Sequence, residues 1–202
     1  MRHAREQGSK VVSICNTHGS TLPRESDAAL YTHAGPEIAV ASTKAFLAQI
    51  TAAYLLGLYL AQLRGNKYKD EISAILGELQ KMPAKIQKVI DNDTLVKELG
   101  AEMKDTSSVI FLGRHVGFPV ALEGALKLKE ISYIHAEGFA AGELKHGPIA
   151  LIEEGQPVII IVPSAQGRES LHGKVVSNIQ EVRARGAFTI VIAEEGDEAV
   201  KD

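Results

Sequence analysis

Short apolar runs alternate with amphipathic stretches along the second half of the chain. The runs at residues 109–112, 157–162 and 188–193 predict buried strands, and the stretches at 119–134 and 169–185 predict helices between them. Strands joined by helices form right-handed crossovers, which make the strands parallel and cover both faces of the sheet. The pattern therefore predicts an α/β fold with doubly wound parallel sheets and flanking helices. It does not predict the order of the strands.

The first half of the chain carries the same signals in a shorter form. Residues 1–7 have the composition of a helix end, and strands are predicted at 11–15 and 28–32. A helix is predicted at 44–63, where apolar residues recur every four positions among other apolar residues, and we expect it to be well buried. Because a lobe rarely begins on a helix end, we interpret residues 1–64 as the C-terminal part of a truncated first lobe.

Amphipathic helices separate these two parts. Residues 70–99 predict two or three helices, interrupted at Pro83 and at the Asp-Asn-Asp sequence of residues 91–93. The predicted organisation is a first lobe at 1–64, a helical connection at 65–106 and a second lobe at 107–202.

Composition narrows the class of protein. The 202 residues are 45% hydrophobic and 23% charged with a formal net charge of −3, which is ordinary for a globular protein and does not favour nucleic acid binding. The only cysteine, Cys15, fits a small buried side chain in the reducing cytoplasm. The most apolar window, 45–63, still carries Gln49, Thr51 and Gln62, so we expect a core helix and no membrane span. The N-terminal residues lack the apolar stretch of a secretory signal, so we expect a cytoplasmic location.

A row of charged residues on the predicted helix at 119–134 is the first candidate for chemistry. At about 100° per residue, Glu123, Lys127 and Glu130 share one helix face. Partial burial beside a cleft would raise the pKa of a carboxyl group and lower that of a lysine, which suits a general base beside a cation. A solvated helix face, where each such pair contributes only about 0.3 to 0.5 kcal/mol, fits the same spacing. The stripe expected to pack on the sheet is apolar: Leu122, Ala125, Leu126 and Tyr133.

The segment after this helix, residues 135–148, combines glycines and small residues with ionisable side chains. Glycines allow the backbone to approach a ligand closely, so we interpret the segment as a functional loop. His146 precedes Gly147 and Pro148, a stiff corner that could hold the imidazole toward a cleft. A structural histidine fits this position as well. No second histidine or cysteine stands at metal-binding spacing, so neither a metal nor a cofactor is predicted.

Several stretches are similar to a known family. Residues 121–137 (ALEGALKLKEISYIHAE) and 141–148 (AGELKHGP) closely resemble the sugar isomerase (SIS) domain of the glucosamine-6-phosphate synthase family, also called isomerizing glutamine-fructose-6-phosphate aminotransferases. The similarity extends along nearly the whole chain, since 24–27 (RESD), 34–37 (AGPE) and 40–46 (VASTKAF) resemble the first lobe of that domain. The resemblance implies SIS-type, flavodoxin-like lobes and an enzyme that converts fructose 6-phosphate and glutamine-derived ammonia to glucosamine 6-phosphate.

The resemblance also implies roles for individual residues. Glu130 matches the base that moves a proton between C1 and C2 of the open-chain sugar, and Lys127 matches a neighbouring lysine that helps to polarise the substrate. His146 matches a histidine that opens the sugar ring and is contributed across a dimer interface. Val40, by its backbone, and Ser42 match positions that line the sugar. An aldose–ketose shift needs one base that accepts and returns a proton near neutral pH, which agrees with the charged row.

Other assignments stay open at the level of sequence. Ser42 fits a cap of the helix that follows it as well as a sugar contact. The resemblance places the phosphate-gripping loop of the family upstream of this chain and its Schiff-base lysine downstream, so we expect negligible activity from the chain alone. It implies a sugar phosphate substrate, a homodimer and a glutaminase domain in the full-length protein. Glu25 and Glu37 fit structural roles, although either could reach the site, and no specific role is assigned to Glu123 or Glu143.

Two other classes of protein resemble this architecture. A sugar-amine deglycase could use an equivalent glutamate and histidine, and a glutaminase domain in the full-length protein would favour the synthase over it. A sugar-phosphate sensor joined to a DNA-binding domain would need the sugar crevice but no base. The combination of Glu130, Lys127 and His146 argues against such a sensor.

Overall fold

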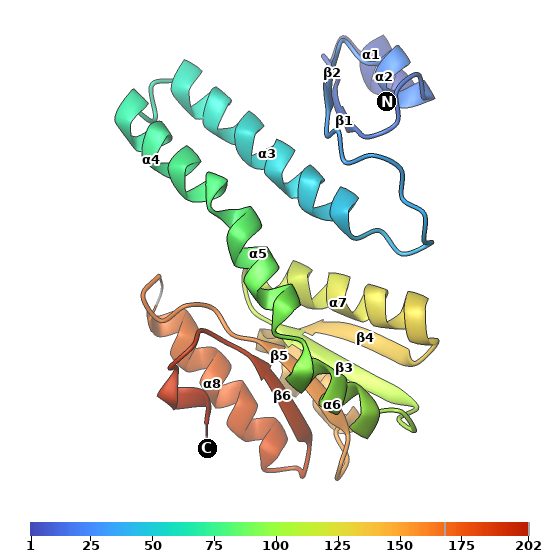
Figure 1. Ribbon diagram of the computed structural model, residues 1–202, viewed down its shortest axis with the longest axis vertical. Coiled ribbons are helices and arrows are strands. Elements are labelled where there is room, and N and C mark those ends of the chain that lie inside the picture. Colours follow the sequence, from blue (N-terminus) through green and yellow to red (C-terminus); the bar gives the residue numbers. More distant parts are fainter. Residues whose placement is uncertain (168, 202) are drawn as a thin grey trace. The chain divides into compact units, whose positions relative to one another are not determined.

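The computed structural model describes residues 1–167 and 169–201 (Figure 1). The chain forms two compact units, Met1–Thr94 and Leu95–Asp202. The division falls inside the helical stretch at 65–106, which the sequence assigns to a connection between lobes.

The first unit combines a small parallel sheet with helices. Strands β1 (Val12–Cys15) and β2 (Ala28–Tyr31) pair in parallel, with Val12 opposite Ala28. Pro83 lies in the first turn of the last helix of this unit, where its missing N–H has no partner to lose. The helices are α1 (Arg2–Glu6), α2 (Thr21–Glu25), α3 (Lys44–Leu63), α4 (Lys69–Gln80) and α5 (Met82–Asp91).

Helix α3 is far more exposed than its apolar sequence predicts. Its buried residues are Ala45, Ala52 and Leu58. The expectation of a well-buried helix is therefore wrong, because a two-stranded sheet and helix α4 cover only part of a helix that is apolar all round. Many of its large apolar side chains are exposed: Leu47, Ile50, Tyr54, Leu55, Tyr59, Leu60 and Leu63.

Among the described residues, α3 is also the one helix with the length and apolar composition to cross a membrane. A single helix of this kind is weak evidence for a membrane span, since core helices of soluble proteins have the same length and composition.

The second unit is built on a four-stranded parallel sheet. Its strands are β3 (Ser108–Gly113), β4 (His135–Ala140), β5 (Pro157–Ile161) and β6 (Phe188–Ile192). They lie in the order β4-β3-β5-β6, and every neighbouring pair is parallel. Helix α7 (Gly117–Ser132) connects β3 to β4, and α8 (Glu169–Arg183) connects β5 to β6. This arrangement confirms the predicted doubly wound α/β fold. The shorter helices of this unit are α6 (Thr94–Glu102), which begins at the last residue of the first unit, and the 3-10 helices η1 (Ala141–His146), η2 (Pro148–Leu151) and η3 (Glu198–Val200).

Alternate residues of β3 face opposite sides of the sheet, as the pleat of a strand requires. Ile110 and Leu112 belong to one buried cluster with residues of α8. Val109 and Phe111 belong to a second cluster with residues of α7. The two helices therefore cover opposite faces of the sheet.

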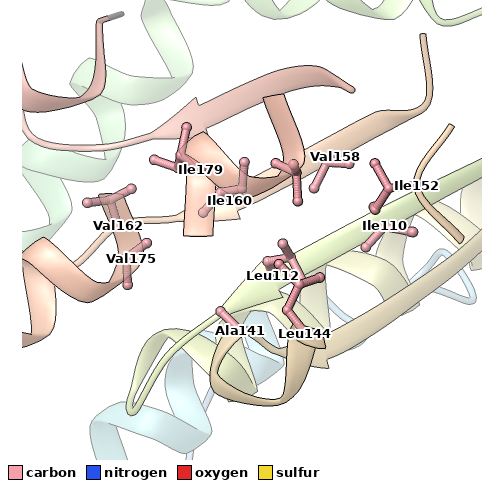
Figure 2. Close-up of a cluster of buried hydrophobic side chains, with 11 residues drawn as sticks. Ile110, Leu112, Ala141, Leu144, Ile152, Val158, Ile160, Val162, Val175 and Ile179 are labelled. Carbon is pink, nitrogen blue, oxygen red and sulfur yellow. The ribbon is translucent and has the colours of Figure 1, made fainter. Parts of the chain in front are cut away.

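The cluster on the α8 face also fixes the segment η1. Figure 2 shows its side chains converging from β3, β5, η1 and α8. Ala141 and Leu144 of η1 are almost completely buried in this cluster, whereas Lys145 and His146 are exposed. Burial of a leucine side chain contributes roughly 1.5 to 3 kcal/mol, so η1 is held firmly while its polar end faces solvent.

The predicted loop over residues 135–148 is wrong in its first half, because His135–Ala140 forms strand β4. This strand lies at the edge of the sheet and pairs with β3 alone. Its sequence, His-Ala-Glu-Gly-Phe-Ala, has none of the β-branched residues that mark the other three strands of this sheet. Gly138 allows close approach of α7, since a Cβ there would lie 3.0 Å from Cα of Leu122.

Candidate active site

Helix α7 lies close to the sheet because its inner face is made of small residues. Its buried residues are Gly117, Ala121 and Ala125. Gly124 also faces the sheet, where a Cβ would come within 2.8 Å of the Phe111 ring. Such close packing fixes the helix, and with it the charged row on its surface.

The predicted packing stripe of α7 is therefore largely wrong. Ala125 is buried as expected, but Leu122, Leu126 and Tyr133 are exposed. Small side chains make the closest contacts between helix and sheet, and Leu128 of the same helix packs against the buried cluster on this face while only partly buried. Tyr133 also ends the helix in the left-handed conformation, with a φ of 62°.

The structure brings together the charged row of α7. The Nζ atom of Lys127 lies 3.6 Å from a carboxylate oxygen of Glu123 and donates a hydrogen bond to Oε2 of Glu130. The three side chains are 21%, 24% and 27% exposed for Lys127, Glu123 and Glu130. The row is thus half-buried and internally paired, unlike the freely solvated face that the spacing alone also allows.

The electrostatics of Lys127 differ from the expectation. The hydrogen bond to Glu130 raises the pKa of Lys127, and the charges of Glu130 and Glu123 act in the same direction, while partial burial opposes them. The expected lowering of this lysine's pKa is therefore wrong, because two carboxylates outweigh the loss of solvent. Lys127 consequently stays protonated at neutral pH. It can act as a fixed cation but cannot act as a base.

His146 lies at the last position of η1, and Gly147 follows it with a φ of 148°. A positive φ of this size favours glycine, so the corner predicted from Gly147 and Pro148 is a real backbone feature. The imidazole is exposed. Within the described residues, no hydrogen bond or ion pair joins His146 to Glu130 or Lys127 in the single chain.

Val40 and Ser42 belong to the irregular segment between β2 and α3 in the first unit. Val40 is 95% exposed, so its side chain makes almost no contact in this unit. The hydroxyl of Ser42 donates a long hydrogen bond of 3.4 Å to Oε1 of Glu37. Ser42 therefore does not cap α3 with its own side chain, and the N-cap, Thr43, makes no side-chain cap either.

Glu37 supplies the helix cap for which the sequence offered Ser42 as a candidate. Its Oε1 atom accepts hydrogen bonds from the backbone N–H groups of Ala45 at 2.9 Å and Thr43 at 3.1 Å. These bonds, that of Ala45 first, lower the pKa of Glu37. A carboxylate also suits the positive end of the helix dipole. The sequence signal was a glutamate shortly before the helix, but its distance in sequence exceeds that of a standard capping box.

Asn16 is a second structural residue that the sequence reading missed. It follows β1, and its Oδ1 atom accepts hydrogen bonds from the Thr32 hydroxyl and the Ala34 N–H, each at 2.9 Å. Its Nδ2 group donates to the Gly35 carbonyl at 2.6 Å. One amide thus fixes the start of the segment that leads to Val40. Glu25 likewise has a structural partner, since its Oε2 atom accepts from Nε of Arg2 at 2.6 Å.

The fold and the sequence together define the class of protein to which this chain belongs. The family model of the SIS domain matches residues 1–59 and 102–202, and the chain belongs to this family.

Particular relatives narrow the comparison further. The chain is 79% identical over 202 residues to a glutamine--fructose-6-phosphate aminotransferase [isomerizing] of Corynebacterium glutamicum, covering 100% of this chain and 32% of the relative. The corresponding protein of Streptomyces coelicolor is 66% identical over 200 residues, with 99% and 32% covered. The C-terminal domain of glucosamine-fructose-6-phosphate aminotransferase from Francisella tularensis has a similar structure, with a TM-score of 0.88 and 42% identity over 94% of this chain and 53% of that chain. The chain thus spans about a third of the length of the curated relatives it matches.

Proposed function

We propose that this chain is the isomerase region of a glutamine-fructose-6-phosphate aminotransferase, an enzyme of hexosamine biosynthesis. The full-length protein would convert fructose 6-phosphate and glutamine-derived ammonia to glucosamine 6-phosphate. In this proposal, residues 65–106 form the helical connection between two SIS lobes. The similarity to aminotransferases at up to 79% identity supports the reaction, and the charged row of α7 supports the site.

The observation that carries the proposal is the position of Lys127 between two carboxylates. A carboxylate that exchanges a proton with carbon must keep its charge without being locked by several cations. Glu130 shares the single cation Lys127 with Glu123, so the row carries two carboxylates and one ammonium group. This surplus of negative charge suits a base, and the protonated Lys127 can polarise an oxygen of the substrate.

Glu130 acts on the imine that forms when ammonia replaces the C2 carbonyl oxygen of the open-chain ketose and water leaves. It removes a proton from C1, and the electron pair forms a C1–C2 double bond while the π electrons of the C2–N bond move to nitrogen, which takes up a proton from solvent. The same group returns the proton to C2 while the O1 hydroxyl loses its proton, which leaves an aldehyde at C1 and an amine at C2. Lys127 stabilises the negative charge that develops on O1 as its hydroxyl proton leaves.

The remaining site residues act on binding and ring opening. His146 moves a proton from the anomeric hydroxyl to the ring oxygen, which opens the sugar. Its exposed position on η1 suits a residue contributed to the active site of a second copy in a homodimer. Val40 binds the sugar through its backbone and Ser42 through its hydroxyl, which is held only by a long bond to Glu37.

The proposal extends to partners and location. The full-length protein carries a glutaminase domain that supplies ammonia, and it works in the cytoplasm without nucleic acid or membrane. A formal net charge of −3 and polar residues within α3 agree with this environment.

The test supplies ammonium and fructose 6-phosphate to the full-length protein, which bypasses glutamine hydrolysis. Formation of glucosamine 6-phosphate, with exchange of the C1 proton into deuterated solvent, is the expected result. We expect negligible product from the 202-residue chain assayed alone. Release of ammonia from sugar amines without synthesis would instead identify a deglycase, and the proposal would be wrong.

A further inference from the structure

A small cavity of the second unit lies away from the charged row of α7. It has a volume of about 170 Å³ and lies among the residue after β3, the segment η1 and helix α8. Its polar lining consists of Arg114, Lys145, Lys174, Ser177, Asn178 and Glu181. Three cationic side chains therefore line the cavity together with a single carboxylate.

Arg114 is held in place from two sides. Its Nη1 group donates a hydrogen bond of 3.2 Å to Oδ1 of Asn178, a buried residue of α8. Its guanidinium also lies against Gly142, where a Cβ would come within 3.0 Å of Nη2. Neither neighbour is charged, so the positive charge of Arg114 is positioned without being neutralised.

Glu181 is already occupied by other groups. Its Oε1 atom pairs with Nζ of Lys145 at 3.0 Å, and its Oε2 atom accepts from the Asn178 amide at 3.3 Å. The Ser177 hydroxyl donates to the same carboxylate at 3.4 Å, longer than the usual O–H···O distance of about 2.8 Å, so this hydroxyl can turn to another acceptor.

Lys174 completes the surplus of positive charge. It is exposed on α8, and among the described residues it makes no ion pair with a carboxylate. Arg114 and Lys174 together thus leave two positive charges that Glu181 does not balance.

We propose that this cavity binds a phosphate group. Two unbalanced cations, a free-turning hydroxyl and a planar guanidinium are the groups that recognise a tetrahedral oxyanion. Sites for drug-sized ligands measure about 300 to 1,000 Å³, so the cavity is too small for a whole sugar phosphate. It has room for inorganic phosphate or for the phosphate of an ester whose organic part stays outside.

A phosphate bound here would link three parts of the second unit. Lys145 directly precedes His146 in η1, and the other ligands come from α8 and from the end of β3. The bound anion would therefore hold the polar end of η1, which Leu144 anchors only from the core side. This site does not depend on the proposed synthase activity.

The experiment is a titration of the isotope-labelled chain with inorganic phosphate at constant ionic strength, followed by NMR. We expect saturable shifts of the Gly142 amide and the Asn178 side-chain amide. Replacing exposed Lys174 by Gln should weaken binding about tenfold, the usual effect of losing a charged hydrogen bond. Lys104→Gln removes the same charge from an exposed site of this unit that does not line the cavity, and its affinity should stay unchanged.

A second titration with fructose 6-phosphate separates the sources of the phosphate group. Saturable, Lys174-dependent shifts at Gly142 with either compound support the site, and the tighter compound identifies the source. Absence of such shifts with both compounds overturns the proposal. Equal weakening by Lys174→Gln and Lys104→Gln also overturns it, since binding would then reflect net charge alone.

Discussion

Helices α3 and α7 are both rich in apolar residues, yet they are used in opposite ways. Helix α7 buries the small residues Gly117, Ala121 and Ala125 and lies close to a four-stranded sheet. Helix α3 buries little and leaves large side chains such as Leu55 and Leu60 exposed. The difference shows that apolar content does not decide burial. A sheet of matching width and small residues at the contact decide it.

The same difference separates two groups of candidate residues, one in each unit. Glu123, Lys127 and Glu130 stand on a helix fixed by close packing, and their mutual distances are set by that helix. Val40 and Ser42 stand on an irregular segment held mainly by Asn16 and Glu37. We therefore expect the second unit to dominate both chemistry and stability.

The largest expected effect is that of Glu130→Gln in the full-length enzyme. Removing the base should lower the rate of glucosamine 6-phosphate formation by about 10²- to 10⁴-fold. Ser42→Ala in the first unit should cost less than about tenfold, because a single neutral hydrogen bond is lost. The exposed Glu137→Gln on β4 is the charge-matched control. A similar loss for Glu130→Gln and Glu137→Gln would remove the base from the mechanism.

Leu144→Ala should produce the next largest change. Its side chain is completely buried, so the free energy of unfolding of the second unit should fall by about 2 to 5 kcal/mol. Leu60→Ala on α3 should change stability by no more than about 1 kcal/mol, since this side chain is half exposed. Denaturant titration with amide hydrogen exchange assigns each loss to its unit. Comparable losses would mean that α3 is covered in solution.

Two matched glycines test the packing of the helices directly. Gly124→Ala on α7 places a methyl group 2.8 Å from the Phe111 ring and should destabilise by about 1 to 3 kcal/mol. Gly57→Ala on α3 meets nothing within 4 Å and should stabilise by up to about 1 kcal/mol through helix propensity. Thermal unfolding measures the change in stability of both variants. If Gly124→Ala were the more stable of the two variants, α7 would not lie as close to the sheet as the structure shows.

The smallest expected effect is a difference in acid stability. The hydrogen bond from His172, 2.7 Å long, lowers the pKa of Asp197, with help from the Ala199 N–H. Because the folded pKa lies below the unfolded value of about 3.9, this carboxylate stabilises the fold above that pH, and the contribution is lost as the pH falls through the folded value. Below about pH 4, the free energy of unfolding should therefore fall less steeply with decreasing pH for Asp197→Asn than for the unmodified chain.

Glu37 is the matched carboxylate of the first unit. Its pKa is lowered by backbone N–H groups, so the ionised carboxylate also stabilises the fold, and this contribution to stability is likewise lost as the pH falls through the folded pKa. Asp197 is only 12% exposed and pairs with a buried histidine. Glu37→Gln should therefore change the pH dependence of the free energy of unfolding in acid less than Asp197→Asn does. The reverse order would contradict the view that the second unit carries the stronger polar contacts.

Local patterns were sufficient for much of the second unit. The β-branched run at 157–162 predicted a buried strand, and β5 occupies Pro157–Ile161. The spacing of Glu123, Lys127 and Glu130 placed them on one helix face, and the structure joins them through Lys127. These features depend on the period of a helix or strand, which is a property of neighbouring residues.

Other features depend on residues distant in sequence, and the pattern missed them. Strand β4 has no β-branched residues, and it exists because β3 offers a free edge. The bond between Arg114 and Asn178 joins residues 64 positions apart, so no local motif marks the cavity they line. The cap of α3 comes from Glu37 because the irregular segment before the helix folds back on it.

The sequence by itself determined the alternation of strands and helices, the family resemblance and the residues with candidate chemistry. Only the tertiary structure decided that α3 is largely exposed, that small residues form the packing face of α7 and that the pKa of Lys127 rises. The physical reason is common to all three. Burial and charge–charge interactions depend on which atoms are brought near one another, and a periodic pattern specifies only the direction in which each side chain points.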